Sequence, residues 1–181
     1  MIVLRQPKII QELSKKNRLK GKTIGFVPTM GALHQGHLSL IRKAREVNDI
    51  VVVSIFVNPA QFGRKEDRKR YPRLIKKDLA LCKKENVDIV FNPKPQDMYP
   101  KDFKTYVFVE GLSDIFCGSS RPGHFRGVAT VVAKLFNLIL PDIAYFGQKD
   151  AQQAAVIKQM VSDLNIPVKI KVMPIFRQKN G

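Results

Sequence analysis

The feature that most constrains the fold is the run Ile50–Val57, which is apolar almost throughout and rich in β-branched side chains. β-Branched residues favour strands, and a strand whose side chains are apolar on both faces is covered on both faces. Strands of this kind are typical of parallel sheets between two helical layers. The run is far shorter than the ~18–20 apolar residues needed to cross a bilayer. It therefore predicts a buried strand.

Strand-length apolar runs alternate with helical patterns along the rest of the chain. Further strands are expected at Ile24–Val27, Val87–Phe91, Ile143–Phe146 and Val168–Val172, and helices at Leu38–Glu46, Leu74–Lys84, Val128–Leu140 and Ala151–Leu164. Tyr106–Val109 predicts a short accessory strand. Such alternation implies βαβ units with right-handed crossovers. We therefore predict an α/β fold of three layers, with a mainly parallel sheet, helices on both faces and one domain over residues 1–181.

The turn Pro28–His37 follows the strand expected at Ile24–Val27 and contains two of the three histidines. Main-chain N–H groups and the positive end of a helix dipole converge at such a turn, which makes it suited to anions. Gly31 and Gly36 allow a ligand to approach the main chain, and His34 and His37 can hydrogen-bond phosphate oxygens. The alternative is a loop with two incidental histidines. The His-x-Gly-His spacing favours a nucleotide site.

Polar residues also follow two other expected strands, and ligands of parallel sheets bind beyond the carboxyl ends of the strands. Asn58 and Gln61 follow Val57, and their amides suit a hydroxylated or carboxylate substrate. An ordinary Asn-Pro turn would explain Asn58 but not Gln61. After Phe146, the residues of interest are Gly147, Gln148, Lys149, Asp150 and Gln153. Lys149 suits a phosphate, while Asp150 is also a plausible N-cap.

Two further clusters leave two readings open. Ser119–Gly127 contains two arginines and a histidine, and forms either an anion-binding loop or a structural anchor. Tyr71–Arg73 predicts a turn into the next helix, in which Asp78 is a weak candidate for a metal ligand.

The net charge of +17 over 181 residues is typical of nucleic-acid-binding proteins. The basic residues, however, are scattered from Lys15 through Arg64–Arg73 to Lys179, and aromatic residues are not interleaved with them. We expect a solvated surface that attracts anionic small molecules, with no nucleic-acid or membrane partner. Cys82 and Cys117 match no metal spacing and no secretory signal is evident, so we expect reduced core or near-core thiols and a cytoplasmic location.

With these residues in view, the chain resembles the pantothenate synthetase (pantoate–beta-alanine ligase) family, part of the nucleotidyltransferase group with the His-x-Gly-His signature. The segments specific to this family are Phe56–Pro59, Ser120–Phe125 and Tyr145–Asp150. The resemblance covers essentially the whole chain. It implies a Rossmann-like domain that binds ATP and pantoate with Mg²⁺. Pantoate would form pantoyl adenylate and pyrophosphate, and beta-alanine would then displace AMP.

The resemblance also implies roles for individual residues. The implied ATP-binding residues are Met30, Gly31, Ala32, Leu33, His34, Gln35, Gly36, His37, Gly147, Gln148, Lys149 and Asp150, with Arg177 beside the adenosine. The implied pantoate ligands are Gln61 and Gln153, the implied beta-alanine contacts are Gln61, Asn58 and Tyr71, and the tentative metal residue is Asp78. The implied catalytic groups are His37, His34 and Lys149. The family position of His37 is usually called a proton donor; we favour charge stabilisation, which a protonated imidazole would combine with that role.

The chain departs from the family pattern in two places. Lys77 stands where a second acidic residue usually precedes Asp78, which puts a two-carboxylate metal contact in doubt. A Ser-Ser-Arg segment and a smaller C-terminal domain follow in the family, so we expect an N-terminal domain with little activity alone. The resemblance also implies a homodimer. The alternatives are another nucleotidyltransferase of the same group and a non-enzymatic, basic nucleic-acid-binding module.

Overall fold

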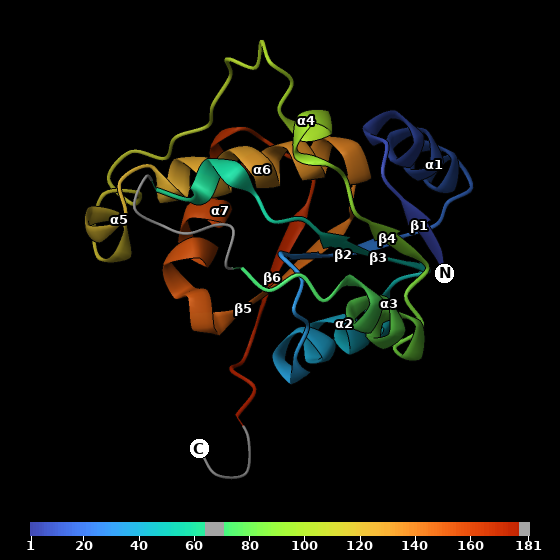
Figure 1. Cartoon of the computed structure of the whole chain (residues 1–181). Helices are drawn as coiled ribbons and strands as arrows, with labels where there is room; N and C mark the ends of the chain where they lie inside the picture. Colours follow the sequence, from blue (N-terminus) through green and yellow to red (C-terminus); the bar gives the residue numbers. More distant parts are fainter. Residues whose placement is uncertain (64–70, 178–181) are drawn as a thin grey trace.

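A six-stranded parallel sheet forms the centre of the molecule in a computed structural model that describes residues 1–63 and 71–177 (Figure 1). Its strands are β1 (Ile2–Leu4), β2 (Ile24–Thr29), β3 (Ile50–Ile55), β4 (Ile89–Phe91), β5 (Ile143–Gly147) and β6 (Lys169–Met173). The order across the sheet is β1-β4-β3-β2-β5-β6, and every pair is parallel. Strands β3 and β4 therefore follow β2 on one side, and β5 and β6 lie on the other side of β2.

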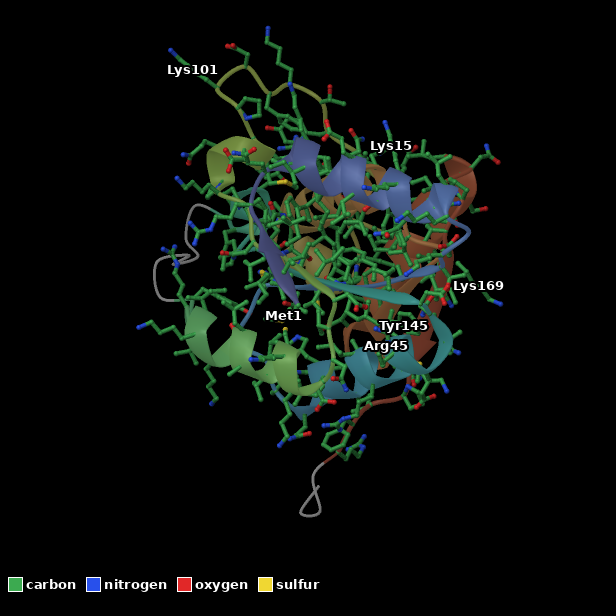
Figure 2. The ribbon with its side chains drawn as sticks, turned by 90° about the vertical axis from the view of Figure 1, so that its right-hand side faces the viewer. Met1, Lys15, Arg45, Lys101, Tyr145 and Lys169 are labelled. Carbon is green, nitrogen blue, oxygen red and sulfur yellow. The ribbon has the colours of Figure 1, made fainter. Side chains whose placement is uncertain are left out.

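Helices cover both faces of this sheet. One face packs against α1 (Pro7–Leu19), α6 (His124–Ile139) and α7 (Ala151–Asp163), and the other against α2 (Gln35–Val47) and α3 (Ile75–Lys84). Figure 2 shows α1, which carries Lys15, and α2, which carries Arg45, on opposite sides of the sheet. Successive strand residues alternate between the two cores: Phe26 belongs to the first and Val27 to the second. The predicted three-layer α/β fold is confirmed.

Most predicted elements are present, with shifted ends. Helix α6 begins at His124 instead of Val128, after a Pro-Gly turn. The strands and α-helices not predicted are β1, α1, α4 (Pro95–Met98) and α5 (Cys117–Ser120). Helix α1 buries only Ile10 and Ser14, so its apolar stripe is narrow, and β1 is a three-residue edge strand. Both are too weakly patterned to be recognised without their neighbours.

The accessory strand predicted at Tyr106–Val109 is wrong. This segment has no regular secondary structure and joins no strand of the described part of the sheet. It runs along α6 instead: the Val107 N–H donates to Thr130 Oγ1 (2.9 Å) and Arg126 lies over the Tyr106 ring (4.6 Å). The segment predicted as a strand thus packs against helix α6 and is not part of the sheet.

Three other sequence-based expectations meet the structure here. Cys82 is a buried free thiol, as predicted, whereas Cys117 is exposed and does not belong to the core. Among the described residues, no helix is both long and apolar enough to cross a membrane. The basic residues of segment 64–70 and Lys179 lie outside the described ranges.

Candidate nucleotide and substrate site

Two neighbouring cavities lie at the carboxyl ends of β2 and β5, where the strand order reverses. In open parallel sheets, this switch point is where ligands bind. The histidine cavity has a volume of about 540 Å³. Its lining residues are Pro28, His34–His37, Leu40, Tyr145–Gly147, Lys149, Asp150, Gln153 and Pro174–Arg177. The amide cavity, of about 260 Å³, includes Met30, His34, His37, Asn58, Gln61, Tyr71 and Gln153. His34, His37, Asp150 and Gln153 line both cavities.

The two imidazoles are fixed at the first turn of α2. His34 is the N-cap, and its Nδ1 accepts the Gly36 N–H (3.1 Å), while His37 Nδ1 accepts the His34 N–H (3.4 Å). Their ring centroids are 4.1 Å apart. A neutral imidazole that accepts at Nδ1 has its proton at Nε2. Each ring is therefore oriented by the main chain and retains one N–H donor.

His37 is held in its neutral form. Burial, with smaller effects of His34 and Lys149, lowers the pKa of His37 to about 4, against an opposing effect of Asp78. A protonated His37, which would combine charge stabilisation with proton donation, is therefore disfavoured in this structure. Two imidazoles and a lysine so close together disfavour a further positive charge. The ring can still donate a hydrogen bond to an anion from Nε2.

Asp78 anchors the turn that precedes His34. Asp78 is 1% exposed, and its two carboxylate oxygens accept the N–H groups of Ala32 (3.0 Å) and Leu33 (2.8 Å). Gly31 and Ala32 both have positive φ, +90° and +52°. A Cβ on Gly31 would lie 3.0 Å from Asp78 Oδ2, so glycine is required by conformation and by space. The strained turn is thus held by a buried carboxylate.

This arrangement does not fit the metal role predicted for Asp78. Mg²⁺ in proteins is usually bound by one or two carboxylates together with substrate phosphates. Each oxygen of Asp78 already accepts a main-chain N–H group, and the side chain is buried, so the carboxylate is directed at the turn. Among residues 1–63 and 71–177, no group of three or more His, Cys, Asp or Glu residues could hold a metal ion. We therefore derive no step through a metal.

The loop after β5 forms the opposite wall of the histidine cavity. Gly147, Lys149 and Asp150 line it, and Gln153 lies one turn into α7. Asp150 occupies the N-cap position of α7 as expected, but its side chain makes no capping hydrogen bond. Arg177, expected near the adenosine, lines the same cavity together with Pro174, Ile175 and Phe176, which sequence reasoning missed.

The amide cavity is built from a hydrogen-bonded turn after β3. Asn58 and Gln61 are almost fully buried, and Asn58 Nδ2 donates to Gln61 Oε1 (3.0 Å). The hydroxyl of Tyr99, at the end of α4, donates to Asn58 Oδ1 (2.8 Å). Sequence reasoning missed Tyr99, because nothing local in the sequence brings it to Asn58.

The basic segment Ser119–Gly127 lies behind this turn. His124 Nδ1 is 2.9 Å from the Gln61 main-chain oxygen, and Arg121 approaches the other ring nitrogen of His124 (3.3 Å). Of the two readings of this segment, these contacts favour the structural anchor over the anion-binding loop. The segment supports the main chain that carries Gln61.

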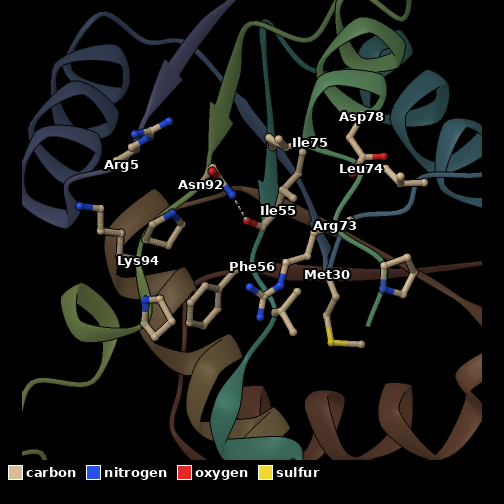
Figure 3. Close-up of a pocket in the computed structure, with 15 residues that line it drawn as sticks. Arg5, Met30, Ile55, Phe56, Arg73, Leu74, Ile75, Asp78, Asn92 and Lys94 are labelled. Carbon is tan, nitrogen blue, oxygen red and sulfur yellow. Dashed lines mark hydrogen bonds between the residues drawn. The ribbon is translucent and has the colours of Figure 1, made fainter. Parts of the chain in front are cut away.

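Not every predicted residue reaches these two cavities. Ala32, Leu33 and Gln148 line neither of them, and Gly31 and Asp78 line a third cavity of about 480 Å³ instead. This arginine cavity also contains Arg5, Arg73 and Lys94. Figure 3 shows Arg5 and Lys94 on one side of it and Met30 on the other. Met30 also lines the amide cavity, so its side chain lies between the two.

The family model for pantoate–beta-alanine ligase matches residues 2–181. The chain belongs to this family. It is 58% identical over 181 residues to the pantothenate synthetase of Caldicellulosiruptor bescii, covering all of this chain and 64% of that protein. The chain thus spans just under two thirds of the length of such relatives.

Solved structures agree with this assignment. The crystal structure of pantothenate synthetase from Thermus thermophilus has a TM-score of 0.94 at 46% identity, covering all of this chain and 64% of that one. Pantoate–beta-alanine ligase from Francisella tularensis has a TM-score of 0.94 at 44% identity, covering 99% of this chain and 69% of that one. That crystal structure is described as complexed with Beta-gamma ATP and Beta-alanine.

Proposed function

We propose that this chain is the nucleotide- and pantoate-binding domain of a pantoate–beta-alanine ligase. The observation that carries the proposal is the pair of adjacent cavities that share His34, His37 and Gln153. In this assignment ATP occupies the histidine cavity, its phosphates near Lys149 and the imidazoles, and pantoate occupies the amide cavity. The ATP and beta-alanine named for the Francisella tularensis structure support the same substrates here.

The reaction proceeds in two steps. A pantoate carboxylate oxygen attacks the α-phosphorus of ATP, a new P–O bond forms, and pyrophosphate leaves with the electrons of the broken P–O bond. The beta-alanine amine then attacks the acyl carbon of pantoyl adenylate. Its C–O bond to AMP breaks, and the nitrogen loses a proton. An ionised carboxylate needs no general base in the first step, so the site must chiefly orient the reactants and stabilise phosphoryl charge.

The imidazoles and Lys149 suit that task. His34 and His37 each offer an Nε2–H donor oriented by main-chain hydrogen bonds at Nδ1. Preorganised donors stabilise developing charge without reorganisation during the reaction. Because the pKa of His37 is lowered to about 4, it acts in this proposal as a neutral hydrogen-bond donor. Lys149 adds a positive charge on the facing wall.

The remaining assignments belong to the same proposal. Asn58 and Tyr71 lie beside the beta-alanine position, and Gln61 and Gln153 contact pantoate. Asp78 acts as the anchor of the histidine turn. The protein as a whole is a cytoplasmic homodimer, and residues 1–181 are one domain of it that uses ATP with Mg²⁺.

Binding measurements test this proposal directly. We expect calorimetry on this chain to detect both ATP and (R)-pantoate, with ATP binding weakened by Lys149→Met and pantoate binding weakened by Gln153→Ala. Neither variant should affect the other ligand strongly. Pyrophosphate release that is equal with pantoate and with unrelated acids would favour another nucleotidyltransferase. Tight, steeply salt-dependent DNA binding without ATP binding would favour the nucleic-acid module.

A further inference from the structure

The orientation of the Asn58 side-chain amide is determined by the main chain. The Ala60 N–H donates to Asn58 Oδ1 (3.2 Å), and Asn58 Nδ2 donates to the Gly127 carbonyl oxygen (3.0 Å). A main-chain N–H can only donate and a carbonyl can only accept. Exchanging the oxygen and nitrogen of this amide would therefore set donor against donor and acceptor against acceptor. The Asn58 oxygen and nitrogen are fixed where they lie.

This fixed amide determines the orientation of Gln61 in turn. The second contact of Asn58 Nδ2 is Gln61 at 3.0 Å, and an atom that faces a donor must be the acceptor Oε1. Gln61 Nε2 therefore points the other way, where it meets Met30 Sδ at 3.2 Å. A thioether sulfur is a weak acceptor. Both Gln61 and Met30 line the amide cavity, so a ligand oxygen could replace the sulfur as the partner of Nε2.

Tyr99 completes the network from a distant part of the chain. Its hydroxyl donates to Asn58 Oδ1 (2.8 Å), and its ring packs against Phe56 and Phe103 with centroids 6.4 and 5.0 Å away. Burial raises the pKa of Tyr99, so the hydroxyl remains a donor at neutral pH. The turn itself cannot retreat: a Cβ on Gly127 would lie 2.2 Å from the Ala60 oxygen, which shows how closely α6 supports it.

We propose that Tyr99 is a positioning residue for the substrate: together with the Ala60 N–H and the Gly127 carbonyl it restrains Asn58, and through Asn58 it keeps the Gln61 NH₂ group facing the amide cavity. The ligand group at this point must then be a hydrogen-bond acceptor, which means a carboxylate or hydroxyl oxygen of a hydroxy acid. An ammonium group has no lone pair to accept this hydrogen bond, so Gln61 Nε2 receives an oxygen of pantoate, or the carboxylate of beta-alanine, and not its ammonium group. The choice of pantoate rests on the proposed function.

The network is tested first without any ligand. We expect Tyr99→Phe to shift the Gln61 side-chain NH₂ signals of the isotopically labelled chain in ¹H–¹⁵N spectra and to speed their hydrogen exchange. Tyr106→Phe is the matched control, because it removes a hydroxyl from the same aromatic cluster without touching Asn58. Unchanged Gln61 signals in Tyr99→Phe would overturn the positioning role.

The second test measures (R)-pantoate affinity by calorimetry. Losing one hydrogen bond of the network should weaken pantoate binding by about three- to tenfold in Tyr99→Phe. Tyr106→Phe should match wild type. Gln61→Glu keeps the size of the side chain but presents an acceptor, so it should bind pantoate more weakly than Gln61→Ala. The reverse order would show that Gln61 acts by volume, and would overturn the inference.

The two tests separate this inference from the proposed function. If the Gln61 signals respond to Tyr99→Phe but the wild-type chain does not bind pantoate, the positioning role stands and the substrate assignment fails. If wild type binds pantoate and Tyr99→Phe binds it equally well, the substrate assignment stands and the positioning role fails.

Discussion

The histidine turn and the amide turn lie next to each other but are held by different physical means. A buried carboxylate, two positive φ angles and two close imidazoles define the first. Neutral amides, a phenol and main-chain groups define the second. The histidine turn is stabilised by a charged group and is therefore sensitive to protonation. The amide turn depends on the direction of hydrogen bonds between neutral groups. The same rim thus combines a turn anchored by a charged group with a turn built from neutral, directional hydrogen bonds.

The largest expected effect comes from removing the charged anchor of the histidine turn. Asp78→Ala leaves the N–H groups of the part-buried Ala32 and the buried Leu33 without an acceptor, which should lower the free energy of unfolding by about 3 kcal/mol or more. Urea denaturation measures this loss. Asp163→Ala, which changes an exposed carboxylate bound to Gln159, is the control and should stay near wild type. Equal stability of both variants would contradict the anchoring role.

Acid should distinguish the two turns next. The folded pKa of His37 is about 4, below the ordinary value of 6.5, so its contribution to stability is complete above pH 6.5 and is lost as the pH falls towards 4. We expect wild type to lose about 2 kcal/mol more than His37→Asn over this range, since one pKa unit corresponds to about 1.4 kcal/mol. Gln61→Met, in the amide turn, should keep the wild-type pH dependence. If the free energy of unfolding of wild type and of His37→Asn fell by the same amount between pH 6.5 and pH 4, the lowered pKa of His37 would be refuted.

A smaller effect is expected from the backbone of the histidine turn. Gly31→Ala forces a side chain into a conformation with φ near +90° and against Asp78, which should cost about 1–2 kcal/mol of unfolding free energy. Gly147→Ala is the control for stability, because no other heavy atom lies within 4 Å of its Cβ position. If both substitutions shift the thermal midpoint equally, the turn is not strained.

The smallest expected effect concerns ligand charge. Lys149→Met should weaken ATP binding by about tenfold, or about 1.4 kcal/mol, and reduce its salt dependence. Pantoate binding, which we assign to the neutral amides, should change little. Lys158→Met, on an exposed part of α7, controls for the general loss of positive charge. Equal losses for both ligands would remove the distinction between the two cavities.

Local patterns predicted most of this architecture. The apolar periodicity of Ile50–Val57 and of the neighbouring helices indicates strand or helix whatever the tertiary contacts of these segments are. The same patterns located the His34–His37 turn, whose spacing and flanking strand are local. The anchoring contacts of Asp78 could not be predicted, because its partners Ala32 and Leu33 lie far away in the sequence. Tyr99 was missed for the same reason: its contact with Asn58 exists only once α4 packs beside the turn.

The parallel pairing of β2 with β5 has a consequence for how the molecule folds. Gly25 pairs with Ile143, so the walls of the histidine cavity come from segments about 120 residues apart. Contacts between such distant segments form slowly, since the intervening chain must first be ordered. We therefore expect nucleotide affinity to emerge late in refolding, after most secondary structure is present, which would make ligand capture a sensitive reporter of the fully assembled state.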